Sequence, residues 1–255
     1  MNRIHKLLVA VMLAVSLLVS LGAETNSWEP HGFVSLRAWD HYLSYRLGTA
    51  PTRTPAIWGE AEVWLQRGFY VNSFGSWSVC EDPAQKMGNQ IDFVLGKRWT
   101  LPQPTRIKLD LSVRYSNIAP VGDWSEADVG YVNLVLSRDF QVTSNQTIRP
   151  HVYSEWMGCL RDFGGGTLIE QAGFTYLWRN PLGIRRLTFS DCNSFSYAGA
   201  WGTIPEAFFF RADVGLNWQI SSKWEMILPG CRFIHGLDGR RKADKSLMAG
   251  LKYKF

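Results

Sequence analysis

The sequence predicts an all-β protein, a transmembrane up-and-down barrel of about twelve antiparallel strands. Three observations support this prediction. Apolar and polar residues alternate with a period of two, the connections between these segments alternate between long and short, and no apolar run of about 18 residues follows the first 22. With 46% hydrophobic residues among 255, the chain is too apolar to be disordered.

The first 22 residues have the pattern of a signal peptide. Arg3 and Lys6 form a short basic start, and an almost unbroken apolar run follows over residues 7–21. An uncleaved anchor is the alternative, although the run is short for a membrane span of about 20 residues. We therefore expect residues 1–22 to be removed on export, leaving residues 23–255 as one barrel domain.

The alternation is clearest between residues 105 and 117. From Ile107 onwards the odd positions are apolar, and from Arg106 onwards the even positions are charged or polar. A β-strand places successive side chains on opposite faces, so this segment offers one face to lipid and one to a polar lumen. Residues 207–220 repeat the pattern.

Twelve segments share this pattern, and their connections are sorted by length. Long polar or glycine-rich connections follow the odd-numbered segments, and short turns such as Asn72, 101–104 and 221–222 follow the even-numbered ones. Transmembrane barrels have this arrangement, with both termini at the tight-turn rim. Ten strands is the alternative, because the segment 73–80 has the weakest pattern of the twelve. The segments are 32–44, 56–71, 73–80, 89–99, 105–117, 127–140, 146–160, 167–178, 184–197, 207–220, 223–236 and 246–255.

Aromatic residues gather at both ends of these segments. We expect two girdles, because Trp and Tyr favour the interfaces of a bilayer. The tight-turn girdle would hold Trp99, Trp178, Trp218, Trp224, Tyr253 and Phe255, and the long-loop girdle Tyr42, Trp58, Trp77, Trp156, Tyr197 and Trp201.

The C-terminal segment ends in alternating apolar residues, Leu251, Tyr253 and Phe255. In this the chain resembles bacterial outer-membrane β-barrels, and the resemblance implies that these three residues form the signal read by the barrel-assembly machinery. Residues 45–48, 68–70, 75–77 and 90–93 also resemble the TorF-type porin family, although Leu47 separates the Arg and Gly of its first turn.

The inward face decides what such a barrel does, and basic residues outnumber acidic ones on it. We predict a passive, porin-like channel for small hydrophilic solutes, with a weak preference for anions. A salt-bridged, non-conducting structural or adhesin-type barrel is the alternative. The predicted pore-lining residues are Arg98, Arg106, Lys108, Asp110, Arg114, Arg149, His151, Glu155, Arg211 and Asp213, and the same parity adds Arg37, Glu60, Glu62, Asp92, Arg186, Lys252 and Lys254.

A hydrolase of the outer-membrane phospholipase kind is a further alternative, because that class combines His, Ser and Asn on a similar barrel. None of the mature histidines, His31, His41, His151 and His235, lies in a His-x-Ser-Asn cluster. We therefore expect no enzyme activity and no catalytic, cofactor or metal site.

Four cysteines are scattered along the chain, and their pairing is open. Cys80, Cys159 and Cys192 have inward parity, and Cys231 can be placed on the same face. The expected partners are outer-membrane lipids, lipopolysaccharide near the basic loop 240–242, the assembly machinery and small hydrophilic solutes. Dispersed basic residues give no support for nucleic-acid binding.

Overall fold

The computed structural model describes residues 31–44, 46–48, 50, 54–79, 89–118, 128–159, 166–201 and 204–255. These residues belong to one compact unit, His31–Phe255. The predicted signal peptide, residues 1–22, lies outside the described residues. Within the described ranges, no helix is both long and apolar enough to cross a membrane.

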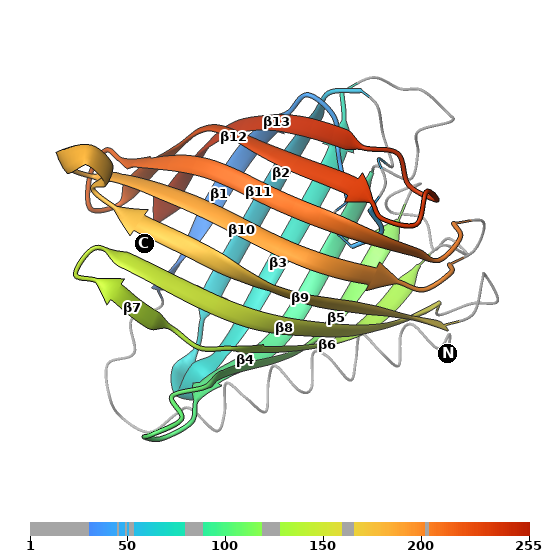
Figure 1. The fold of residues 1–255 in the computed structure, drawn as a ribbon, viewed down its shortest axis with the longest axis horizontal. Coiled ribbons are helices and arrows are strands. Elements are labelled where there is room, and N and C mark those ends of the chain that lie inside the picture. The colour runs from blue at the N-terminus through green and yellow to red at the C-terminus, as the bar shows by residue number, and fades with distance from the viewer. Residues whose placement is uncertain are drawn as a thin grey trace. The chain divides into compact units, whose positions relative to one another are not determined.

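Twelve long strands close into an antiparallel barrel (Figure 1). Each strand pairs with its sequence neighbours, and the barrel closes where β1 pairs with β13. A short strand, β7, extends the line of β6 after a break, and β6 itself pairs with β8. The strands are β1 (His31–Trp39), β2 (Ala56–Trp64), β3 (Phe69–Ser78), β4 (Gln90–Thr100), β5 (Lys108–Ile118), β6 (Val129–Ser137), β7 (Phe140–Thr143), β8 (Gln146–Cys159), β9 (Gly166–Arg179), β10 (Leu187–Ala198), β11 (Ala207–Gln219), β12 (Trp224–Gly236) and β13 (Asp244–Lys254).

The two faces of the barrel follow the alternation in the sequence. On β5, Leu111 is 44% exposed on the outer face, whereas Ser112 is 7% exposed on the inner face. On β11, Phe208 faces outward and Phe209 is fully buried. The predicted outer and inner faces are therefore confirmed on these strands.

The closing seam between β1 and β13 begins at the tight-turn rim. Gly32 and Phe255 exchange two backbone hydrogen bonds of 3.1 and 3.2 Å. Tyr253 packs beside Trp224, with ring centroids 4.8 Å apart. The first described strand and the last strand thus begin and end side by side.

The predicted turn at Asn72 is wrong, because the chain reverses at residues 65–68. Arg67 and Gly68 both have left-handed backbone conformations there, with φ of 55° and 81°. A side chain on Gly68 would begin about 2.0 Å from the carbonyl oxygen of Arg98, so only glycine fits this close approach. Asn72 instead lies within β3, opposite Glu62.

Three other predicted strand ends are also wrong. β1 ends at Trp39 rather than residue 44. β5 begins at Lys108, and Arg106 lies in the preceding turn with φ of 46°. β10 begins at Leu187, because Arg186 has φ of 67° and cannot continue a strand. The turns are therefore wider than the hydrophobic pattern indicates.

The tight-turn girdle has the expected outward side chains, including Trp218, Trp224 and Phe255, which are 41–43% exposed. At the other rim, Trp77 and Trp156 also face outward. Tyr42, Trp58 and Trp201 do not belong to a girdle, because they are buried inside the barrel at 3–7% exposure. Tyr42 belongs to the first long connection and packs with Trp58, and Leu47 of the same connection packs against the cluster that contains Trp201.

Candidate functional site

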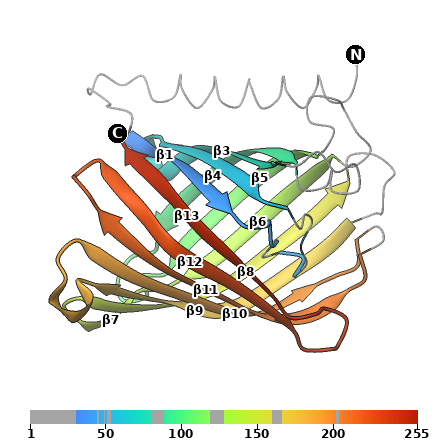
Figure 2. The same cartoon turned by 90° about the horizontal axis from the view of Figure 1, so that it is seen from above.

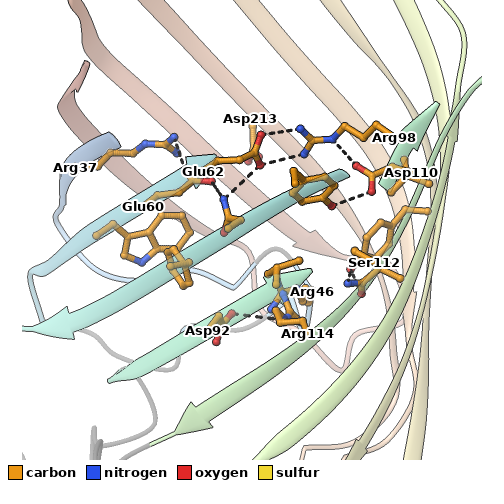
Figure 3. A pocket seen from close by; sticks show the side chains of 18 of the residues that line it. Arg37, Arg46, Glu60, Glu62, Asp92, Arg98, Asp110, Ser112, Arg114 and Asp213 are labelled. Carbon is orange, nitrogen blue, oxygen red and sulfur yellow. Dashed lines mark hydrogen bonds and ion pairs between the residues drawn. The ribbon is translucent and has the colours of Figure 1, made fainter. Parts of the chain in front are cut away.

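A polar cavity of about 480 Å³ occupies the barrel interior (Figure 3). Strands from both halves of the barrel contribute to it, because every inward-facing position of a closed barrel points at the same space. Among the described residues that line it, six are arginines and five are carboxylates. These are Arg37, Arg46, Arg98, Arg114, Arg211 and Arg232, with Glu60, Glu62, Asp92, Asp110 and Asp213.

One row of ion pairs crosses the inner wall from β1 to β5 (Figure 3). Arg37 contacts Glu60 at 3.2 Å, and Asn72 donates hydrogen bonds to Glu60 and Glu62. Arg98 donates to Glu62 at 2.6 Å and to Asp110 at 2.8 Å. The row continues because neighbouring strands place their inward side chains about 5 Å apart.

Asp110 also accepts a hydrogen bond from the hydroxyl of Tyr70, at 2.8 Å. The guanidinium of Arg98 lies over the Tyr70 ring, 3.9 Å from its centroid. The ring can lie flat against the wall because Gly96 has no side chain beneath it: a Cβ there would be 2.4 Å from the ring. This glycine therefore sets the position of both Tyr70 and Arg98.

A second, more deeply buried cluster surrounds Glu155, which is fully buried on β8. Its carboxylate lies 3.1 Å from Arg114 and 3.6 Å from Arg46, and it accepts a hydrogen bond from Tyr153. Arg114 also lies 3.7 Å from Asp92. The two positive charges of Arg46 and Arg114 are thus matched by the two carboxylates of Asp92 and Glu155 on the inner face of the barrel, where an unpaired buried charge would destabilise the fold.

The third group lies on β11 and β12. Arg232 binds Asp213 through two hydrogen bonds of 2.8 and 3.0 Å, and Arg211 lies 3.4 Å from the same carboxylate. Arg211 also donates to the sulfur of Cys192, which confirms that Cys192 faces inward. Two arginines share one carboxylate here, so this part of the wall has a net positive charge.

The described residues of the first long connection lie inside the barrel, packed against its far wall (Figure 2). We call these residues, 42–44, 46–48 and 50, the lumen strap. Leu43 is fully buried in a cluster whose other members come from strands β9 to β12, on the far wall: Ile169, Ala198, Phe209 and Ile234. Leu47 packs against this cluster and against a second one around Tyr131 and Trp201.

The strap explains the buried aromatic residues at this rim. Trp39, Tyr42 and Trp58 pack together where the strap leaves β1, with ring centroids 5.2 Å apart in each pair that involves Trp58. Arg46, on the strap, reaches Glu155 and also lies 5.5 Å from the Tyr131 ring. The strap thereby narrows the lumen at the long-loop end.

The structure brings five of the ten predicted pore-lining residues to the cavity: Arg98, Asp110, Arg114, Arg211 and Asp213. Glu155 lies beside it, bound to Arg114. Lys108 and Arg149 lie nearer the tight-turn rim and both contact Asp139, at 2.5 Å. His151 lies on β8 opposite Ser137. Arg106 is exposed in a turn, outside the strand that would have turned it inward.

Arg46 and Arg232 line the cavity but were absent from the predicted set. Strict alternation fails on β12 because the register shifts between Ile227 and Gly230. This irregularity turns Arg232 inward and Cys231 outward, so the inward assignment of Cys231 is wrong. The Pro229-Gly230 pair is the signal in the sequence, because Pro and Gly within a strand mark such irregularities.

Cys192 and Cys231 are both free thiols. Cys80 lies outside the described residues, as does the side chain of Cys159. No group of three or more His, Cys, Asp or Glu residues in the described part of the chain is placed to hold a metal ion.

The histidines are spread over the barrel. His31 contacts Trp64 and His235 stacks on Phe233, while His41 lies between Asp40 and Asp244 at 3.1 and 3.3 Å. Each of these three therefore has an aromatic or acidic neighbour, and they lie on different strands or loops.

No protein-family model and no curated protein sequence matches the chain. Among solved structures, the NanC porin is 9% identical with a TM-score of 0.56, and the match covers 87% of this chain and all of that one (100%). An outer-membrane channel from Pseudomonas putida F1 is 11% identical with a TM-score of 0.53, covering 91% of this chain and 98% of that one. At these identities the likeness is one of fold, and the chain has the fold of outer-membrane channel barrels.

Proposed function

We propose that the protein is a passive outer-membrane channel for small hydrophilic solutes. The cavity of about 480 Å³, lined by arginines and carboxylates, is the observation that supports this most directly. An apolar solute would have to displace water from these charged groups, whereas a polar one can replace some of their hydrogen bonds. The fold shared with the NanC porin and the Pseudomonas putida channel favours the same function.

A weak preference for anions belongs to this proposal. At the tight-turn end, Lys108 and Arg149 share the single carboxylate of Asp139. Fixed positive charge at a mouth with low-dielectric walls raises the local concentration of anions. The preference should be weak because most arginines of the cavity are paired with carboxylates.

Conductance across a planar bilayer tests both parts. The refolded protein should form ion-conducting channels, and the reversal potential in a KCl gradient should indicate a small excess of chloride permeability. That excess should fade at high salt, where the screening length falls to about 3 Å at 1 M.

The strap and the paired charges favour a second candidate, a structural barrel that does not conduct. Absence of any conductance from correctly folded protein would support that candidate and contradict the channel. A cation-selective channel would contradict only the charge argument.

The proposal includes assembly in the outer membrane, with the outward apolar residues in lipid and lipopolysaccharide around the long loops. Leu251, Tyr253 and Phe255 would be the assembly signal, and Leu251 and Phe255 are exposed beside the closing seam at 38% and 41%. Deleting Phe255 should reduce recovery in outer membranes in cells more than it reduces refolding in detergent. Equal losses in both would contradict a recognition role.

A further inference from the structure

A single arginine joins the lumen strap to two loops at the long-loop rim. Arg241, in the connection between β12 and β13, donates from Nε to the carbonyl oxygen of Leu47 at 3.2 Å. Its Nη2 donates to the carbonyl oxygen of Pro205, in the connection between β10 and β11, at 2.5 Å. The guanidinium of Arg241 therefore links three segments: the strap, the β10–β11 connection and its own β12–β13 connection.

The strap has another anchor further inside. Arg232 donates to the carbonyl oxygen of Leu43 at 2.9 Å while its other nitrogens bind Asp213. Arg232 is only 8% exposed, and Leu43 is fully buried among side chains from the far wall. This inner anchor combines apolar burial with a guanidinium whose position is set by a carboxylate, so it should be firm.

The surroundings of Arg241 are much more open to water. Its neighbour Arg240 pairs with Glu206 at 2.8 Å, and both side chains are 50% exposed. Asp238 accepts the backbone N–H of Phe208 at 2.9 Å on the same exposed loop. Exposed ion pairs such as that of Arg240 contribute little and are screened by salt. The hydrogen bond from Arg241 to Leu47 is also more open to water than the buried one from Arg232 to Leu43, whereas the side chain of Leu47 packs against both buried clusters.

We propose that Arg241 is a positioning residue that keeps Arg46 and Leu47 across the lumen, and that loss of its contact lets the strap turn about Leu43 and widen the channel. Arg46 would then leave Glu155, so the lumen would also lose the ion pair between the strap and β8. The conductance part of this inference rests on the proposed channel function. The movement of the strap does not.

Cleavage by trypsin after Arg46 measures the position of the strap directly. In the folded wild-type protein the side chain of Arg46 is 14% exposed, and cleavage should be slow. In Arg241→Ala the fragment that begins at Leu47 should appear about tenfold faster, because losing a hydrogen bond from a charged donor shifts a local opening equilibrium by roughly that factor. The same variant should show larger single-channel conductance.

Lys242→Ala is the matched control, because it removes one positive charge from the same loop, and it should behave like wild type. Arg241→Lys should fall between wild type and Arg241→Ala, since an ammonium cannot span two carbonyls as a guanidinium does. It also serves as the test if Arg241→Ala fails to refold.

Unchanged cleavage and conductance in both Arg241 variants would overturn the proposal. Faster cleavage without conductance in any variant would support the moving strap and contradict the channel function. Faster cleavage with unchanged conductance of a conducting channel would overturn the claim that the strap limits the pore.

Discussion

Replacing Glu155 by Gln tests the buried charge cluster. The carboxylate is fully buried and lies 3.1 Å from Arg114 and 3.6 Å from Arg46. Gln keeps nearly the same volume, so no cavity forms, but it removes the negative charge that both guanidiniums face. Asp92, 3.7 Å from Arg114, would then be the remaining carboxylate for both.

Removing one partner of a buried ion pair costs about 3–5 kcal/mol, because the other charge remains in a low-dielectric site. If the free energy of unfolding falls by about 3 kcal/mol per molar urea, the urea concentration at the unfolding midpoint should fall by roughly 1–2 M. The assay is urea unfolding of the refolded barrel in liposomes, followed by tryptophan fluorescence and by the different gel mobility of folded and boiled protein.

Asp110→Asn is the matched control. It also removes a carboxylate from an arginine, but Arg98 keeps Glu62 at 2.6 Å, and the side chain of Asp110 is 24% exposed. This substitution should lower the free energy of unfolding by only about 0–1 kcal/mol. Adding Arg46→Met to Glu155→Gln should restore part of the lost stability, because it removes the excess positive charge that Asp92 alone cannot balance. Equal midpoints for Glu155→Gln and Asp110→Asn would refute the reasoning.

Three further predictions follow from the faces, the packing and the loops. Leu111→Arg should lower the yield of folded protein, since a guanidinium facing lipid near the midplane costs roughly 2–4 kcal/mol. Ser112→Arg, on the inner face, should fold and change the conductance. Equal loss of folded protein in the two variants would contradict the assignment of faces. Gly96→Ala should cost about 1–3 kcal/mol through overpacking against Tyr70, measured by urea unfolding, whereas Gly215→Ala, whose Cβ would lie 3.5 Å from Ser190, should change little. Hydrogen bonds from Arg240 and then Tyr197 hold the pKa of Glu206 below its usual value, so its contribution to the loops should be complete above that value and be lost as the pH falls through the lowered pKa. The carboxylate of Glu206, followed by infrared spectroscopy as the difference between wild type and Glu206→Gln, should therefore stay ionised from pH 7 to about 5 and be protonated only in stronger acid.

Much of the barrel can be predicted from the sequence because its period-two pattern is local. Leu111 and Ser112 show their faces through their immediate neighbours, and the outward Trp218 and Trp224 mark a rim through their places at strand ends. Arg98, Asp110 and Arg114 were found for the same reason: on an uninterrupted strand, parity alone decides which side a residue occupies.

The rest depends on contacts between distant parts of the chain. Alternation says nothing about the lumen strap, whose place in the lumen is set by Phe209, Ile234 and two arginines about 190 positions later in the sequence. The inward turn of Arg232 depends on a register shift against β13, which parity cannot foresee. The strands and their faces are thus properties of the sequence read locally, whereas the narrowing of the lumen exists only in the closed barrel, because closure brings the far wall within reach of the first loop.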